Sequence, residues 1–316
     1  MALRLAKERI DLRISFGFHE TTKHALHLEQ HVREFEPHVF VIESADIIET
    51  ERKESIDKTN RIWAKCRGNV DTRADALRFL RREFNGFEEQ VLRIISSSRH
   101  RINPYIVEGY TEDEIKLDCA AAKKFEEVEV GEILAILARG AIEEALARNI
   151  KAMRRYTAAK VIPRNKRIVD GFEIMCEELP ELFERTLYAN PLRVLARYGI
   201  AHEAVVEELR KLGFNVAALK DSEVQSPRFS LIIDFSKNIL MEVSAEQQII
   251  ALFDLIYSYV FPYRIVSVTE LEFGSEMNNV FRRLGGATGF VELLRATANA
   301  TNDLDVFERM MRERFS

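Results

Sequence analysis

Cysteine is scarce in this sequence, with three residues among 316. Cys66, Cys119 and Cys176 lie far apart and in no paired spacing, which argues against a disulfide framework and against a thiolate zinc site. The chain also has no Gly-x-Ser-x-Gly elbow, no phosphate-binding loop ending in Gly-Lys-Ser/Thr and no Cys-x-x-Cys pair. These absences remove the commonest sequence signatures of hydrolases, nucleotide-binding proteins and dithiol redox proteins.

Long apolar runs and an excess of one charge are absent as well. The first residues carry charge and include no apolar stretch of signal-peptide length, so we expect a cytoplasmic protein that is not secreted by that route. The most apolar segment, 249–268, contains Asp254, Pro262 and Arg264, which disfavour a membrane span. The net charge is −5, with 46 basic and 51 acidic residues interspersed, so the overall charge does not favour a nucleic-acid partner.

The sequence does contain a repeated β-α-β pattern. The first unit has a strand, a helix and a short apolar strand, predicted at 12–18, 21–35 and 39–42. The second has the same order of elements, predicted at 192–198, 203–212 and 215–219. We therefore predict an α/β fold with a mostly parallel sheet, in which the carboxyl ends of the strands at 12–18, 39–42 and 192–198 are neighbours.

Helical periodicity dominates the chain between the two units. We predict an α/β core over 1–225 with a large helical insertion at about 46–186, interrupted by one more strand at 105–108. The composition shifts near residue 225 through Ser222, Ser226 and Pro227. We expect a smaller α+β segment over 226–316, with strands at 229–235 and 263–268, either as a separate unit or as part of the same domain.

Two histidines occupy matching positions in the repeated units. His19 and His202 both follow a strand that ends in glycine, and both are followed by glutamate, which is Glu20 in the first unit. Ligands of open α/β sheets bind beyond the carboxyl ends of the strands, where Glu43 also lies. A histidine at a helix N-terminus tends to stay neutral, as a base or a metal ligand must. A single histidine at a strand end is more often structural, but two in matching positions beside Glu43 favour a functional site.

The order strand-His, strand-Glu, helical Arg, strand-His resembles the superfamily that joins TraB pheromone-shutdown proteins, Tiki metalloproteases, erythromycin esterases and ChaN-like haem-binding lipoproteins. Gly199-Ile200-Ala201-His202 matches the second Gly-x-x-His motif of that group, and Glu43 matches the carboxylate that closes its second strand. Two positions depart from the pattern. Phe16-Gly17-Phe18-His19 has its glycine shifted by one residue, and Pro163-Arg164-Asn165 has proline where the group has an acidic residue.

This resemblance implies a hydrolase that acts on a small molecule or a peptide. His19 and His202 would act as a base or would bind a divalent metal together with Glu20 and Glu43, and Arg164 would stabilise an oxyanion or a substrate carboxylate. The alternative is a non-catalytic regulatory protein of the same fold that binds a small ligand or a short peptide. The sequence identifies neither the substrate nor the metal, and it is compatible with a homo-oligomer.

Three further patterns have simpler interpretations than a functional one. His24, His27 and His31 share a helical face, which we interpret as a partly exposed surface and not as a metal site. The cations between Arg148 and Arg167 lack interleaved aromatic residues, so a solvated helix surface is expected there and no nucleic-acid partner. The glycines between 285 and 289 follow a helical segment and are interpreted as a turn.

Overall fold

The computed structural model describes residues 6–17, 22–43, 47–67, 101–182, 191–220, 226–262 and 270–316, with short pieces at 74–75, 78, 93–95 and 98. The chain forms two compact units. The first comprises Met1–Ile115 and Arg164–Asp221, and the second comprises Lys116–Pro163 and Ser222–Ser316. Each unit therefore contains segments that are distant in the sequence.

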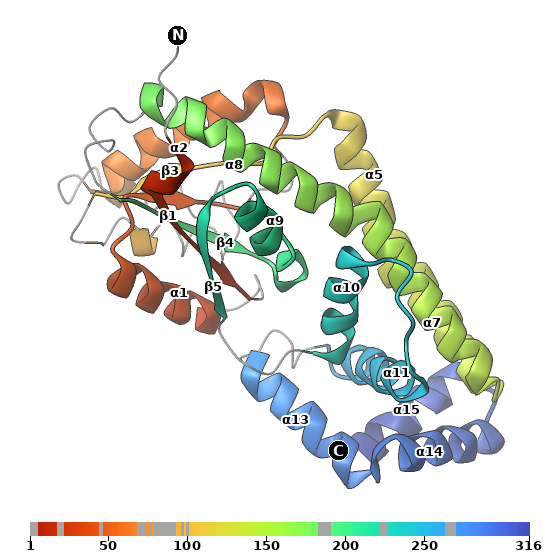
Figure 1. The fold of residues 1–316 in the computed structure, drawn as a ribbon. Helices are drawn as coiled ribbons and strands as arrows, with labels where there is room; N and C mark the ends of the chain where they lie inside the picture. The colour runs from red at the N-terminus through yellow and green to blue at the C-terminus, as the bar shows by residue number, and fades with distance from the viewer. Residues whose placement is uncertain are drawn as a thin grey trace. The chain divides into compact units, whose positions relative to one another are not determined.

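A five-stranded parallel sheet with the order β3-β2-β4-β1-β5 forms the centre of the first unit (Figure 1). Its strands are β1 (Ile10–Phe16), β2 (Val39–Val41), β3 (Asn103–Tyr105), β4 (Leu192–Tyr198) and β5 (Asn215–Lys220). In the pairing of β1 with β4, Phe16 is opposite Tyr198. The predicted α/β class is confirmed, and the first strands of the two repeated units are direct neighbours whose carboxyl ends meet at one edge of the sheet.

Helices cover both faces of this sheet, with α1 and α8 on opposite sides (Figure 1). The α-helices of the first unit are α1 (Thr22–Phe35), α2 (Arg52–Cys66), α8 (Ile162–Leu182) and α9 (Val205–Lys211), and short 3-10 turns are η1 (Lys7–Arg9), η2 (Glu49–Glu51) and η6 (Ile200–His202). On α1, Leu28 and Val32 pack in one apolar cluster with Leu195 of β4. On the other face, the Phe172 ring of α8 meets the Tyr198 ring edge to face at 6.5 Å.

Glycine allows α8 to approach the chain that follows β3. A Cβ atom at Gly171 would lie 2.1 Å from the carbonyl oxygen of Val107, which no real side chain could tolerate. The helix therefore lies directly on the backbone beyond the sheet edge. This close approach places Arg164 and Asn165, about two helical turns earlier in α8, next to the ends of the strands.

The third strand differs from its prediction. It was expected at 105–108, whereas β3 covers Asn103–Tyr105 and pairs with β2 over three residue pairs. The apolar run from Tyr105 to Val107 continues past the last paired residue, so the sequence pattern placed the strand too late. Glu108 consequently lies beyond the end of the strand.

All the regular secondary structure of the described residues of the second unit is helical. It contains most of α5 (Glu112–Lys123), followed by α6 (Val130–Ala138), α7 (Ile142–Tyr156), α10 (Pro227–Lys237), α11 (Ala245–Val260), α13 (Glu270–Arg283), α14 (Gly286–Ala300) and α15 (Leu304–Phe315). Two π-helical segments adjoin these helices, η3 (Lys124–Glu129) and η4 (Thr157–Val161). The aromatic rings of Phe253, Phe281 and Phe290 pack together in the apolar core.

The strand predicted at 229–235 is wrong, because this segment forms helix α10. Ser226 caps the helix by accepting a hydrogen bond from the Phe229 amide, and Pro227 occupies the first turn, where its missing N–H costs nothing. Buried Asp254 of α11 accepts hydrogen bonds from the Ser226 hydroxyl and from the Arg228 amide, the latter at 3.0 Å. The strand predicted at 263–268 lies outside the described residues. Among the described helices, none is long and apolar enough to cross a membrane.

Candidate functional site

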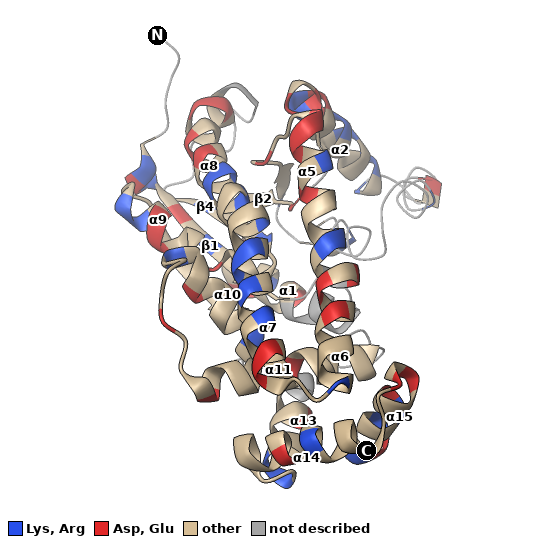
Figure 2. Ribbon diagram, turned by 90° about the vertical axis from the view of Figure 1, so that its right-hand side faces the viewer, with Lys and Arg blue, Asp and Glu red and all other residues tan. Residues whose placement is uncertain are grey.

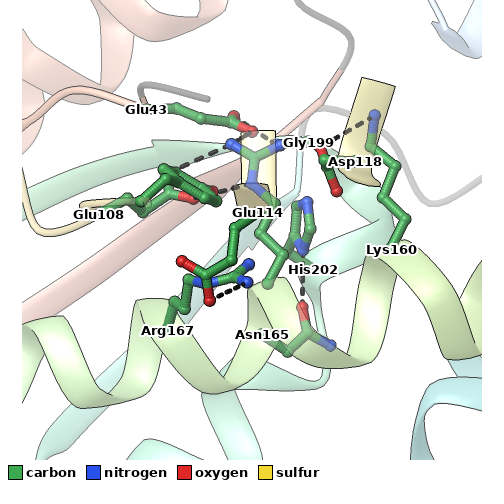
Figure 3. Close-up of polar contacts among 11 residues, drawn as sticks. Glu43, Glu108, Glu114, Asp118, Lys160, Asn165, Arg167, Gly199 and His202 are labelled. Carbon is green, nitrogen blue, oxygen red and sulfur yellow. Dashed lines mark hydrogen bonds and ion pairs between the residues drawn. The ribbon is translucent and has the colours of Figure 1, made fainter. Parts of the chain in front are cut away.

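Polar side chains gather where the strands of the first unit end. Glu43 follows β2, Glu108 follows β3 and Gly199 follows β4, while Asn165 comes from the first turn of α8 (Figure 3). Arg164 precedes Asn165 in the same turn. Because parallel strands end at the same edge of a sheet, residues separated by more than 150 positions become neighbours here.

Arg164 joins the two glutamates. Its Nη2 atom lies 2.6 Å from Oε1 of Glu43, its Nε donates to Oε1 of Glu108 at 2.7 Å, and Nη2 also donates to Oε2 of Glu108 at 3.3 Å (Figure 3). The side chains are 8% exposed for Arg164, 12% for Glu43 and 0% for Glu108. This buried ion cluster holds one cation between two carboxylates, and Nη1 of the guanidinium takes part in none of these three contacts.

The same Glu43 carboxylate fixes the turn that carries His202. Oε2 of Glu43 accepts the Gly199 N–H at 2.9 Å, and the Gly199 carbonyl accepts the His202 N–H at 3.0 Å in the 3-10 turn η6. The imidazole lies against α8, with Nδ1 at 2.6 Å from Oδ1 of Asn165 (Figure 3). Because the amide oxygen accepts hydrogen bonds, this contact requires a proton on Nδ1, and in the neutral imidazole the lone pair is then on Nε2.

Burial and the neighbouring charges shift the pKa values of the acidic groups in this cluster. Burial raises the pKa of the Glu108 carboxyl group, Arg164 lowers it, and the negative charge of Glu43 raises it again, with a net upward direction. The Tyr110 hydroxyl donates to Oε1 of Glu108 at 2.5 Å. Burial, then the negative charges of Glu108 and Glu43, raises the pKa of Tyr198 well above its ordinary value. The phenol of Tyr198 therefore stays protonated.

Tyr198 is the last residue of β4 and is completely buried. Its ring lies edge to face with the His202 imidazole, with 6.4 Å between the ring centroids. Its hydroxyl has no hydrogen-bond partner among the side chains and backbone groups that the structure describes. A buried donor without a partner is costly, so this hydroxyl is a candidate for hydrogen bonding to a bound molecule or water.

The structure brings together three of the residues singled out from the sequence, namely Glu43, Arg164 and His202. His19 and Glu20 lie outside the described residues. His202 is buried, with 5% of its surface exposed, and it precedes α9 in a short turn. Arg164, expected to stabilise an oxyanion, directs Nε and Nη2 at carboxylates of its own chain.

Sequence reasoning missed Glu108, Tyr110, Asn165 and Tyr198. Glu108 had the same signal as Glu43, a carboxylate after an apolar strand, and could have been found by the same argument. Asn165 belongs to the Pro-Arg-Asn motif but had no assigned role. Tyr110 and Tyr198 gave no signal, because an aromatic residue in or after a buried strand is typical of a core.

The described residues do not form a metal site. They contain no group of three or more His, Cys, Asp or Glu side chains arranged to hold an ion. Of the four predicted ligands, Glu43 and His202 are described. The Glu43 oxygens contact the Arg164 guanidinium and the Gly199 N–H. This carboxylate therefore balances the charge of an arginine.

Five of the eight cations between Arg148 and Arg167 form ion pairs with carboxylates, two of which belong to α5, where Figure 2 shows acidic residues. The pairs are Arg148–Glu129, Arg155–Glu129, Lys160–Asp118, Arg164–Glu108 and Arg167–Glu114. In α1, His31 is half-buried and its Nδ1 lies 3.1 Å from the Ser15 hydroxyl. The side chains of His24 and His27 are outside the described part of the chain.

Comparisons with models of protein families, with characterised proteins and with solved structures found no match for this chain.

Proposed function

We propose that this chain is a hydrolase whose site lies at the carboxyl edge of the sheet in the first unit, and that it belongs to the TraB, Tiki and erythromycin-esterase superfamily. The observation that carries the proposal is the joining of Glu43, Arg164 and the His202 turn through direct contacts. Parallel strands alone bring Glu43 and His202 to one edge, but they do not require the direct ion pair that joins Arg164 of a helix to Glu43.

His202 acts as the general base. With its proton on Nδ1 held by Asn165, Nε2 accepts a proton from water as the water oxygen attacks the carbonyl carbon of an ester or amide. The bond to the leaving alcohol or amine then breaks, and the proton passes from Nε2 to the leaving group. Water is consumed, and the carboxylic acid and the alcohol or amine are released.

Glu43, Arg164 and Asn165 are positioning residues in this scheme. Arg164 fixes the Glu43 carboxylate, Glu43 holds the Gly199 N–H, and the turn from Gly199 presents the imidazole. The protonated hydroxyl of Tyr198 is suited to donate to the oxyanion that develops on the carbonyl oxygen. This scheme assigns no role to a metal ion.

The test is hydrolysis of a panel of p-nitrophenyl esters, lactones and short peptides by the full chain and by His202→Gln. Removing a general base costs about 10²- to 10⁴-fold in rate. His38→Gln is the matched control, because His38 is also ordered, accepting the Arg193 N–H at 3.0 Å, but lies at the amino end of β2. We expect the control to retain the wild-type rate. Added imidazole should partly restore the activity of His202→Ala.

Retention of the wild-type rate by His202→Gln would refute the assignment of the base. A wild-type chain that turns over nothing in the panel but retains a co-purified small molecule or peptide would support the non-catalytic binding protein instead. Thermal unfolding of each variant separates loss of chemistry from loss of fold, because buried His202 also contributes packing.

A further inference from the structure

We propose that the second unit binds a small amphipathic monoanion, an aromatic or aliphatic carboxylate, in a pocket between the segments 121–129 and 152–159. The pocket has a volume of about 430 Å³, within the range of about 300–1,000 Å³ that is usual for small-molecule sites. All of its lining residues belong to the second unit. The proposal is therefore independent of the hydrolase site in the first unit.

Two aromatic rings and four alanines shape the pocket. The rings of Phe125 and Tyr156 stack at 4.6 Å between centroids with 26° between their planes, and together they present an apolar surface. The small residues Ala121, Ala152, Ala158 and Ala159 complete the walls and leave space between the two segments. An aromatic or aliphatic group of a ligand would bury apolar surface against these rings and methyl groups.

Two π-helical turns face the pocket. The turn η3 contributes Lys124, Phe125 and Glu129, and the turn η4 contributes Ala158 and Ala159. The two turns are the π-helical segments of the described residues, and both line the same pocket. π-helical turns are rare and occur frequently at functional sites, because the wider turn redirects side chains that a regular helix would place elsewhere. An accidental gap between packed helices would not be expected to have a π-helical turn on each side.

The charges at the pocket select a negatively charged ligand. Glu129 is buried and already bound by Arg148, whose Nε lies 2.7 Å from its carboxylate, while Arg155 lies 3.3 Å from the other oxygen. Lys124 has no ion pair with any side chain that the structure describes. Two cations and one neutralised carboxylate thus border an apolar cavity, which matches a ligand with one carboxylate and an apolar body.

Isothermal titration of the full chain with 1-naphthoate and with decanoate tests this proposal, with neutral 1-naphthylmethanol as the comparison ligand. We expect saturable binding of one carboxylate per chain and weaker binding of the neutral compound. Lys124→Glu should weaken carboxylate binding about tenfold, since reversing a charge beside the ligand removes an attraction and adds a repulsion. Ala158→Leu should weaken binding by occupying part of the pocket.

The matched controls lie in the same unit. Lys151→Glu makes the same charge change on an exposed residue of α7 that does not line the pocket, and Ala120→Leu makes the same size change on an exposed residue of α5. Neither should alter binding. The proposal is overturned if the wild-type chain binds neither carboxylate at millimolar concentration, if the controls weaken binding as much as the pocket variants do, or if naphthylmethanol binds as tightly as naphthoate. If Ala158→Leu lowers thermal stability, the comparison of Lys124→Glu with Lys151→Glu decides whether the pocket binds the carboxylate.

Discussion

Replacing Arg164 with methionine should destabilise the first unit strongly at neutral pH. The substitution removes the cation that lies between Glu43 and Glu108, and Glu108 is fully buried. Breaking a buried ion pair by removing one partner costs about 3–5 kcal/mol, because the remaining charge is left uncompensated. Methionine keeps much of the volume, so little of this cost comes from a cavity.

The pH dependence distinguishes this electrostatic mechanism from a packing effect. Arg164 lowers the pKa of Glu108, so its loss moves that already raised pKa further above the ordinary value of 4.5. A carboxyl group with a raised pKa in the folded state binds its proton more tightly there than in the unfolded chain. Stability is then fully present below pH 4.5 and is lost as the pH rises through the folded pKa. The deficit of Arg164→Met relative to wild type should therefore shrink on acidification.

Urea unfolding followed by tryptophan fluorescence measures this effect. Trp63 is the only tryptophan, is buried, and lies in the first unit together with Arg164. The double variant Arg164→Met/Glu108→Gln should recover part of the lost stability by removing the unpaired charge. As a matched control, Arg167→Met breaks the partly exposed pair with Glu114 and should cost no more than about 1 kcal/mol. A deficit of Arg164→Met that equals the control, or one that is independent of pH, would refute the reasoning.

Three further predictions concern the packing around the site, a second buried ion pair and the metal dependence of the activity. Gly171→Ala should destabilise the chain by about 1–3 kcal/mol in urea unfolding, because its Cβ would overlap the Val107 carbonyl, and no loss would mean that α8 can shift at little cost. Glu178→Gln should cost about 1–3 kcal/mol near neutral pH, because Glu178 accepts hydrogen bonds from buried Arg52 at 2.7 Å and from Tyr105 at 2.5 Å. Its pKa is lowered, since these hydrogen bonds outweigh burial, so this stabilisation is lost as the pH falls below 4.5 and the deficit should narrow in acid. Dialysis against EDTA should leave ester hydrolysis unchanged, and a loss of activity that zinc or manganese restores would show that a metal takes part.

Patterns in the sequence were sufficient to predict much of the sheet. The strand predicted at 192–198 has the same bounds as β4, and the strands at 12–18, 39–42 and 215–219 correspond to β1, β2 and β5. Buried parallel strands are apolar throughout, and the helix between them has a different period, so the β-α-β order is visible locally. Because parallel strands must share a carboxyl edge, the sequence also predicted that Glu43 and His202 would lie at one edge.

Tertiary structure decided what those residues contact. The run 229–235 is apolar enough for a strand or a buried helix, and the cap at Ser226 with its partner Asp254 from α11 favours the helix. Glu108 became part of the ion cluster because β3 ends early and because Gly171 lets α8 lie on the chain beyond it. Pairing between side chains so far apart depends on how helices pack on the sheet, and local sequence patterns carry no information about that packing.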